Sequence, residues 1–264
     1  MQKSLLREDI KLLDIFRNWK YKHDFKKANP FFFDPIGTVI FCGSQGKGKT
    51  LSAVNYIYQI LEAYPYCILC TNVALKDYPF TAHLEGEKVV YNSTGEIVTS
   101  DDILNGTYSD RVIVEYSGLD CLKYINNGYY GVVYLIDEIH LELNSLESKN
   151  IDVDVMVEIS QQRKQRKHIV GTSQVYMRLA KPLREQIFDI VLCNNYFKIF
   201  QLNKLINGET AKEENGKLEC EVKGRYFYIH SPEMYSRYDT FAKMKRYSKE
   251  WQGKKRKEVV YDVR

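Results

Sequence analysis

The chain has 264 residues, of which 44% are hydrophobic and 27% are charged, and its formal net charge is +4. These values are ordinary for a globular protein, and the small net charge gives no argument for nucleic acid by itself. No apolar run approaches about 18 residues, and charges interrupt the apolar residues of the N-terminus, so we expect neither a membrane span nor a secretory signal. Six cysteines in a chain of this length predict a reducing, cytoplasmic compartment rather than a disulfide scaffold.

The first predicted element is an amphipathic helix over residues 4–25, in which basic residues alternate with apolar ones. Basic residues also crowd residues 243–264, and aromatic side chains lie among the charges at both ends. Such segments can follow a phosphate backbone, but a solvated helix face and a frayed tail explain the same charges equally well.

A glycine-rich segment separates a predicted buried strand at 38–42 from a predicted helix at 51–63. It fits the phosphate-loop pattern of Gly, four free positions, Gly-Lys and Ser/Thr. Its backbone N–H groups can surround phosphate oxygens, Lys49 can reach the β- and γ-phosphates, and Thr50 can bind magnesium. The alternative is a chance glycine turn, but the flanking strand and helix favour a site for a nucleoside triphosphate, ATP, with Mg²⁺. The predicted nucleotide-binding residues are Gly43, Ser44, Gln45, Gly46, Lys47, Gly48, Lys49 and Thr50.

The next segment contains shorter predicted elements. A strand is expected at 67–71, and its two cysteines form a lone CxxC that favours a place in the core over a metal site. A hairpin is expected from strands at 88–91 and 96–99. A short strand at 111–115 and a short helix at 119–124 complete this part.

An apolar run at 132–136 ends in Asp137 and Glu138, as expected for a buried parallel strand whose carboxyl end meets the ligand. Asp137 can hold the magnesium ion, directly or through water, and Glu138 can orient or deprotonate the attacking water. This pair favours hydrolysis over phosphoryl transfer to a small substrate. The alternative is a strand end followed by a solvated acidic turn.

A helix is predicted at 152–167, followed by a strand at 168–174 that ends in Gln174. Gln174 can sense the γ-phosphate or position water, and Arg163 or Arg166 can reach a neighbouring subunit as an arginine finger. The alternatives are that Gln174 simply ends a core strand and that the arginines complement the dipole of the helix end.

Beyond Gln174, a helix at 175–187 is expected to lead to a fifth core strand at 189–193. Tyrosine-rich strands at 197–202 and 225–229, joined through a charged loop at 207–217, would add an antiparallel extension.

The order of these motifs resembles the FtsK–HerA superfamily, most closely the small viral genome-packaging ATPases and the Zot-type phage proteins. The resemblance covers about residues 36–240 and rests on the phosphate loop and on the segments 135–140, 161–166, 169–174, 181–184 and 238–240. It implies an α/β fold with a RecA-like core, a mostly parallel central sheet, helices on both faces and a small antiparallel extension. In these families Lys49, Thr50, Asp137, Glu138 and Gln174 would have the roles given above.

The resemblance further implies a homo-oligomeric ring, favouring a hexamer, that translocates double-stranded DNA independently of sequence. The leading expectation is an ATPase that packages a viral genome into a preformed capsid, in the host cytoplasm or docked at the capsid's portal vertex. Two alternatives are a Zot-type assembly or export ATPase, which would need a membrane partner, and a slow nucleotide switch that binds a protein. The expected parts are a basic helix at 1–30, the ATPase domain at 31–240 and a basic tail at 241–264.

Overall fold

The computed structural model describes residues 12–105, 111–146, 151–214 and 217–239. Contacts divide the chain into one compact unit of residues 1–32 and another of residues 33–264. The first unit contains α1 (Leu12–Ala28), which confirms the second half of the predicted N-terminal helix and extends it by three residues. The start of that helix and the tail after residue 239 lie outside the described residues.

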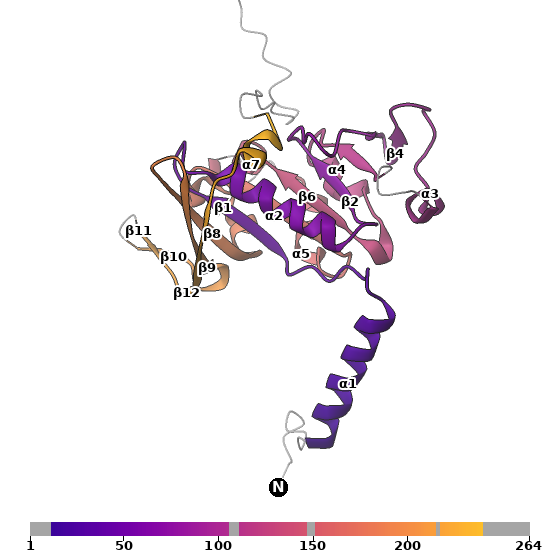
Figure 1. The fold of residues 1–264 in the computed structure, drawn as a ribbon, viewed down its shortest axis with the longest axis horizontal. Helices are drawn as coiled ribbons and strands as arrows, with labels where there is room; N and C mark the ends of the chain where they lie inside the picture. The colour runs from indigo at the N-terminus through magenta and orange to yellow at the C-terminus, as the bar shows by residue number, and fades with distance from the viewer. Residues whose placement is uncertain (1–11, 106–110, 147–150, 215–216, 240–264) are drawn as a thin grey trace, which may run out of the picture. The chain divides into compact units, whose positions relative to one another are not determined.

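The second unit is an α/β domain built on a single large sheet (Figure 1). The strands of the large sheet are β1 (Thr38–Cys42), β2 (Ile68–Thr71), β3 (Ala82–Glu85), β4 (Lys88–Tyr91), β5 (Ile113–Glu115), β6 (Val132–Ile136), β7 (Lys167–Ser173), β8 (Ile187–Tyr196), β9 (Phe200–Asn207) and β12 (Val222–Ile229). A separate small hairpin contains β10 (Lys212–Glu214) and β11 (Lys217–Glu219). Its helices are α2 (Lys49–Ala63), α3 (Ser100–Asn105), η2 (Gly128–Tyr130), α4 (Asp120–Tyr124), η3 (Ile139–Leu141), α5 (Val153–Gln161), η5 (Tyr176–Arg178), α6 (Lys181–Arg184), η6 (Gly208–Thr210) and α7 (Pro232–Ser236).

The strand order in the sheet is β12-β9-β8-β1-β7-β6-β2-β5-β3-β4. The strands from β8 to β3 run parallel to their neighbours, whereas β4, β9 and β12 are antiparallel. Strand β7 therefore lies between the strand before the glycine-rich loop, β1, and the strand before the acidic pair, β6. This order confirms the predicted RecA-like core, with a mostly parallel central sheet and an antiparallel extension.

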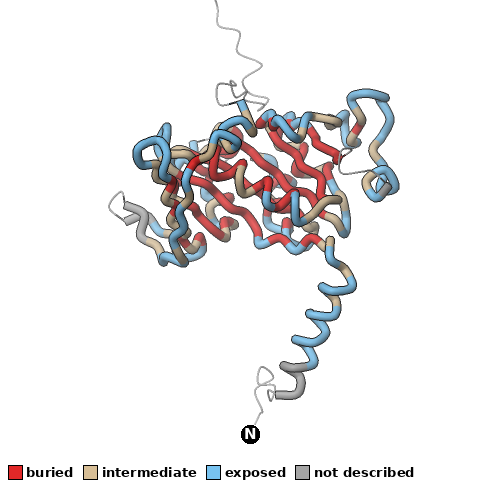
Figure 2. The backbone as a smooth tube through the Cα atoms, in the orientation of Figure 1, coloured by how far each residue is buried: buried red, intermediate tan, exposed pale blue. Residues whose placement is uncertain are grey.

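Two hydrophobic cores cover the two faces of the sheet, because side chains alternate along each buried strand. In β6, Val133 and Leu135 join the core beneath α2, and Tyr134 and Ile136 join the core that includes α4, α5 and α6. Burial is continuous through the central strands (Figure 2). Such strands need no polar face, which is why the run at 132–136 is wholly apolar. No helix among the described residues is both long and apolar enough to cross a membrane.

The structure corrects the predicted hairpin at 88–91 and 96–99. Strand β4 pairs along its whole length with β3, through a turn at Gly86, and meets the second predicted strand only at one bridge between Val90 and Ile97. The pattern missed β3 because its outer residues are half-buried or exposed at the sheet margin.

Two predicted helices are shorter than expected. The helix at 152–167 ends with α5 at Gln161, and a turn then leads into β7. The prediction of a continuous helix at 175–187 is wrong, because only the short η5 and α6 form, and an extended Leu179 separates them. Leu179 forms an antiparallel bridge with Asn144, and the Ala180 N–H donates to the Leu143 carbonyl at 2.9 Å, so tertiary pairing replaces helical hydrogen bonds.

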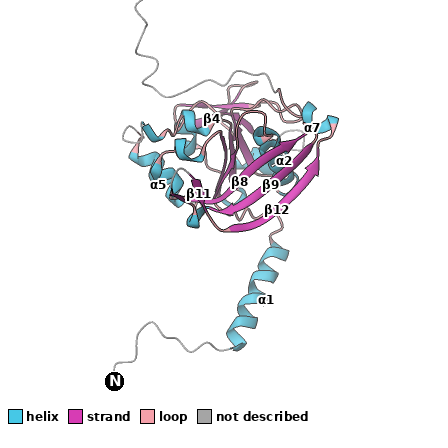
Figure 3. Cartoon of the chain, turned by 90° about the vertical axis from the view of Figure 1, so that its left-hand side faces the viewer, coloured by secondary structure: helices cyan, strands magenta, loops and turns pink. Residues whose placement is uncertain are grey.

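The antiparallel extension is larger than predicted. Strand β8 runs to Tyr196, four residues beyond its last pair with β1, and pairs with β9, which in turn pairs with β12 (Figure 3). The charged loop predicted at 207–217 includes η6 and enters the small β10–β11 hairpin.

Candidate nucleotide-binding site

The glycine-rich loop connects β1 to α2 at the carboxyl edge of the parallel strands. Gly46 and Gly48 have φ values of 75° and 78°, in the left-handed region that glycine adopts without strain. A Cβ atom at Gly48 would also collide with Oε1 of Gln201. The backbone therefore favours glycine, and a larger residue would have to displace the Gln201 amide.

Helix α2 begins at Lys49, directly after this loop, so its first N–H groups face the loop. The Lys49 side chain is buried and its Nζ lies 3.4 Å from the Ser44 carbonyl oxygen. The loop thus places an ammonium group and unpaired helix N–H groups around one small volume, which is the arrangement that binds a phosphate chain.

Thr50 and Asp137 meet across the sheet edge, as the magnesium prediction requires. The Thr50 hydroxyl donates to Oδ1 of Asp137 at 2.8 Å. Thr172, at the end of the intervening β7, donates to the same oxygen at 2.6 Å. Magnesium prefers one or two protein oxygens together with phosphate and water oxygens. A hydroxyl and a carboxylate beside the phosphate loop fit that preference.

Glu138 has a left-handed backbone with φ 52° and ψ 44°, which is unusual for a residue other than glycine. Its N–H donates to the Thr172 hydroxyl at 2.9 Å, and this bond holds the turn. Burial raises the pKa of the Glu138 carboxyl, against the opposing effect of the Lys49 cation. The Gln174 amide lies 3.4 Å from Oε1 of Glu138. The structure therefore brings Glu138, Gln174 and Lys49 together.

Two residues to which the sequence motifs assigned no role lie beside Glu138. The Nδ1 atom of His140 is 3.2 Å from Oε2 of Glu138. Burial, followed by the Arg178 and Lys49 cations, lowers the pKa of His140. Arg178 also opposes the raised pKa of Glu138. An arginine of the same subunit thus contributes positive potential to this site.

Asn72 is a further site residue that the sequence analysis missed. Its side-chain amide donates to the Asp137 carbonyl at 3.0 Å, and its Oδ1 accepts from the Asp137 N–H at 2.8 Å. It follows β2 directly, so the rule that polar residues at the carboxyl ends of parallel strands converge could have found it.

We expect Asn72→Ala to lower ATP turnover about tenfold, because Asp137 would lose both bonds that fix its backbone. Asn127→Ala is the matched control. Asn127 is also half-buried and donates to two backbone carbonyls, at 2.8 and 2.9 Å, but it precedes β6 at the opposite edge of the sheet. Both variants should lose about 1–2 kcal/mol of unfolding free energy in urea. Equal turnover in the two variants would show that Asn72 only stabilises the fold.

The structure places Arg163 and Arg166 far from the phosphate loop of their own subunit. Both precede β7, whereas the loop lies where the parallel strands end, so they are at opposite edges of the sheet. Arg163 is exposed, and Arg166 donates to the Phe33 carbonyl at 3.0 Å. Neither can reach the phosphate loop of the same chain, and their role as a finger for a neighbouring subunit stays a prediction.

No protein-family model and no curated protein sequence matches the chain. Among solved structures, the chain is similar to the N-terminal domain of zonular occludens toxin from Neisseria meningitidis, with 14% identity, a TM-score of 0.46 and coverage of 77% of this chain and 98% of the other. It is also similar to the genome-packaging NTPase B204 of Sulfolobus turreted icosahedral virus 2, with AMPPCP bound, at 12% identity, a TM-score of 0.45 and coverage of 70% and 96%. A third is the flagellar accessory protein FlaH of Methanocaldococcus jannaschii, at 12% identity, a TM-score of 0.41 and coverage of 75% and 95%.

The assignment of the fold rests on this chain's own features, which are the phosphate loop, the strand β7 inserted between β1 and β6, and the acidic end of β6. The chain therefore has an α/β fold with a RecA-like core and a phosphate loop after β1.

Proposed function

We propose that this protein hydrolyses ATP and uses the energy to translocate double-stranded DNA, packaging a viral genome into a preformed capsid. The observation that supports hydrolysis most directly is the convergence of Thr50, Asp137, Glu138 and Gln174 beside the phosphate loop. These residues come from α2 and from the carboxyl ends of β6 and β7, so the parallel sheet itself brings them together.

Each residue has one task in this proposal. The loop N–H groups and Lys49 hold the phosphates, and Thr50 with Asp137 holds Mg²⁺. When bound, Mg²⁺ neutralises phosphate charge and ATP supplies the bond that is cleaved. Glu138 accepts a proton from the attacking water, and its raised pKa brings it nearer to neutral pH, where a base is most effective. Gln174 orients the Glu138 carboxyl through their contact.

The DNA part of the proposal is supported by the sequence resemblance and by α1. The described part of this helix exposes Lys20, Lys22, Lys26 and Lys27. Trp19 and Tyr21 are 67% and 70% exposed on the same helix. Cations contact phosphates and aromatic rings can lie against sugars or bases, without reading sequence. Such binding should weaken steeply as salt rises.

A homo-oligomeric ring, with a hexamer favoured, belongs to the same proposal. A ring would place Arg163 or Arg166 of one subunit within reach of its neighbour's nucleotide, which neither can do within a subunit. The proposed partners are double-stranded DNA and a capsid or portal vertex, and the proposed location is the host cytoplasm.

The experiment that tests this function is steady-state ATP hydrolysis with and without long double-stranded DNA, with Glu138→Gln as the inactive control. We expect DNA to stimulate turnover and the stimulation to vanish in the control. Turnover that does not respond to DNA would contradict translocation and favour a Zot-type export ATPase or a nucleotide switch. Flotation with liposomes together with a membrane partner would then support export.

Deleting residues 243–264 is expected to weaken DNA binding while basal ATP hydrolysis stays within about twofold. The deleted segment carries many cations but no nucleotide-binding element. Fluorescence anisotropy with a labelled duplex, at two salt concentrations, measures the effect. A smaller salt dependence in the deletion variant would confirm lost phosphate contacts, and an unchanged affinity would exclude the tail as a contact.

A further inference from the structure

The antiparallel extension touches the phosphate loop through buried polar side chains. Gln201 and Asn203 of β9 are both fully buried, although glutamine and asparagine are usually exposed. They lie two residues apart and therefore point to the same face of the strand, the one toward the loop and the start of α2. Buried amides of this kind are kept only where they are hydrogen-bonded.

Gln201 makes three polar contacts. Its Nε2 donates to the Lys47 carbonyl at 3.0 Å and to Oδ1 of Asn203 at 2.8 Å. Because this nitrogen faces two oxygens, Oε1 is the accepting end, and Nε2 of His230 lies 3.2 Å from it. One side chain thus connects the phosphate loop, β9 and the end of β12.

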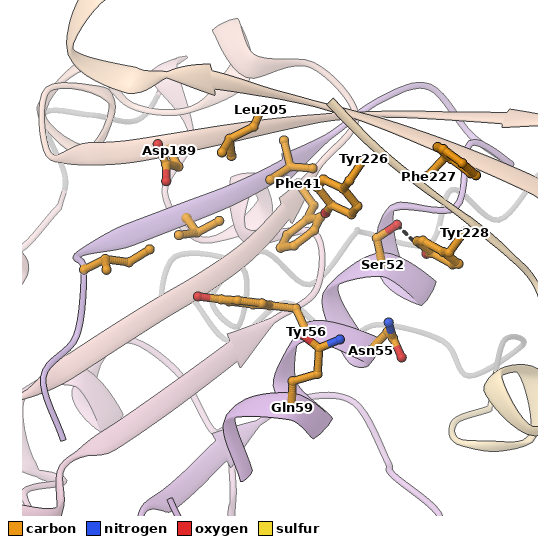
Figure 4. Close-up of a pocket in the computed structure, with 13 residues that line it drawn as sticks. Phe41, Ser52, Asn55, Tyr56, Gln59, Asp189, Leu205, Tyr226, Phe227 and Tyr228 are labelled. Carbon is orange, nitrogen blue, oxygen red and sulfur yellow. Dashed lines mark hydrogen bonds between the residues drawn. The ribbon is translucent and has the colours of Figure 1, made fainter. Parts of the chain in front are cut away.

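A second arm continues from Asn203 to the first turn of α2. The Asn203 amide donates to the Ser52 hydroxyl at 3.1 Å, and the Ser52 oxygen lies 2.8 Å from the hydroxyl of Tyr228 (Figure 4). The loop and the helix that follows it are therefore both bonded to the same pair of strands.

Next to this polar contact, the space between α2 and the extension is hollow. A cavity of about 430 Å³ lies there, lined by residues of β1, α2, β8, β9 and β12. Ser52 and Tyr228 are among its lining residues, as are Tyr56, Tyr226 and Leu205 (Figure 4). Leu205 of β9 packs against the core that includes α2, and the polar contacts of Gln201 and Asn203 add hydrogen bonds at the loop.

We propose that Gln201 is a positioning residue for the phosphate loop, which holds the Lys47–Gly48 backbone in the conformation that receives phosphate. Gly48 lies close to Gln201, because a Cβ atom at position 48 would collide with the Gln201 side chain. The inference rests on the proposed function in that the loop binds ATP. It adds that β9, outside every motif of the sequence, determines the loop's geometry.

The first test needs no nucleotide. Amide hydrogen exchange is measured on the peptide that covers residues 43–52 in the wild type and in Gln201→Met, a neutral replacement of similar size. In the wild type, the Lys47 N–H donates to the Ser44 carbonyl and the Ser52 N–H to the Gly48 carbonyl. We expect these amides to exchange about threefold to tenfold faster in the variant, since about one net hydrogen bond holding the loop is lost.

Gln162→Met is the matched control. Gln162 is also buried, and its Oε1 accepts from the Thr38 hydroxyl at 2.9 Å, at the edge of the sheet away from the loop. This control should lose similar stability without altering exchange at residues 43–52. The proposal would be overturned if residues 43–52 exchanged equally fast in the two variants, or no faster in Gln201→Met than in the wild type. This result does not depend on whether the protein binds ATP.

The second test separates positioning from general destabilisation through kinetics. Gln201→Met should raise the KM for ATP about tenfold and leave kcat within about twofold, because a displaced loop weakens ground-state and transition-state binding alike. Lys49→Ala, which removes the phosphate-binding cation, tests nucleotide binding itself. Loss of ATP affinity in Lys49→Ala with an unchanged KM in Gln201→Met would retain the proposed function and refute the role of Gln201.

If Gln201→Met does not fold, His230→Leu provides the same test from the other end of the contact. His230 is 9% exposed and supports Gln201 from outside the loop. We expect a smaller change in the same direction, with KM raised about threefold and faster exchange at residues 43–52. An unchanged KM and unchanged exchange in this variant would also count against the proposal.

Discussion

Replacing Glu138 with glutamine is expected to lower ATP turnover by about 10²- to 10⁴-fold, because the amide cannot accept a proton from water. The affinity for ATP should change by less than about threefold. In the proposed site, Lys49, Thr50 and the loop hold the nucleotide and do not depend on the Glu138 carboxylate. Single-turnover hydrolysis and a binding titration with a fluorescent ATP analogue measure the two quantities.

Glu142→Gln is a suitable control for this variant. Glu142 is another buried acid, four residues further along the chain and just beyond η3, outside the set of residues that meets the loop. Its replacement should leave single-turnover hydrolysis within about threefold. Comparable turnover in Glu138→Gln and the wild type would reject Glu138 as the base and would direct attention to Gln174 and His140.

Asp137→Asn is expected to raise the Mg²⁺ concentration needed for half-maximal hydrolysis and to lower turnover in Mg²⁺ about 10³-fold, since a metal contributes several kcal/mol to the transition state. The asparagine oxygen can still accept the hydrogen bonds from Thr50 and Thr172. The fold should therefore survive, and the loss should arise from the missing charge. Hydrolysis measured across a Mg²⁺ titration reports this effect.

Thermal unfolding with ATP provides the matching measurement for Asp137→Asn. A ligand raises the melting temperature according to its affinity for the native state. In the wild type, Mg²⁺ with ATP should stabilise the protein more than ATP alone, whereas in Asp137→Asn the stabilisation that Mg²⁺ adds should be much smaller. If Mg²⁺ adds as much stabilisation in the variant as in the wild type, Asp137 does not hold the magnesium ion.

The central strands and the loop could be predicted because each is encoded by neighbouring residues. The short runs at 38–42 and 132–136, rich in β-branched and aromatic residues, favour strands buried on both faces. The glycines between β1 and α2 supply the left-handed backbone that the loop needs. The position of Asp137 next to Thr50 then follows from parallel strands ending at one edge.

What could not be predicted depends on pairs far apart in the chain. Asn72 and Asp137 are 65 positions apart, and Gln201 and Lys47 are 154 apart, so no local pattern connects them. The missing helix at 175–187 has the same origin, because residues 143 and 144 satisfy the backbone that a helix would have satisfied. Local helix propensity does not determine the structure where a distant segment offers better hydrogen bonds.

The left-handed backbone of Glu138 has a consequence for how this protein could be engineered. A glycine would occupy that conformation without the steric cost that a side chain imposes, so the position is one at which a more stable protein is available. A stability screen that ignores activity would select that change and would remove the carboxylate. Thermostabilising this chain therefore means holding position 138 fixed and seeking gains elsewhere, because the strain there accompanies the chemistry.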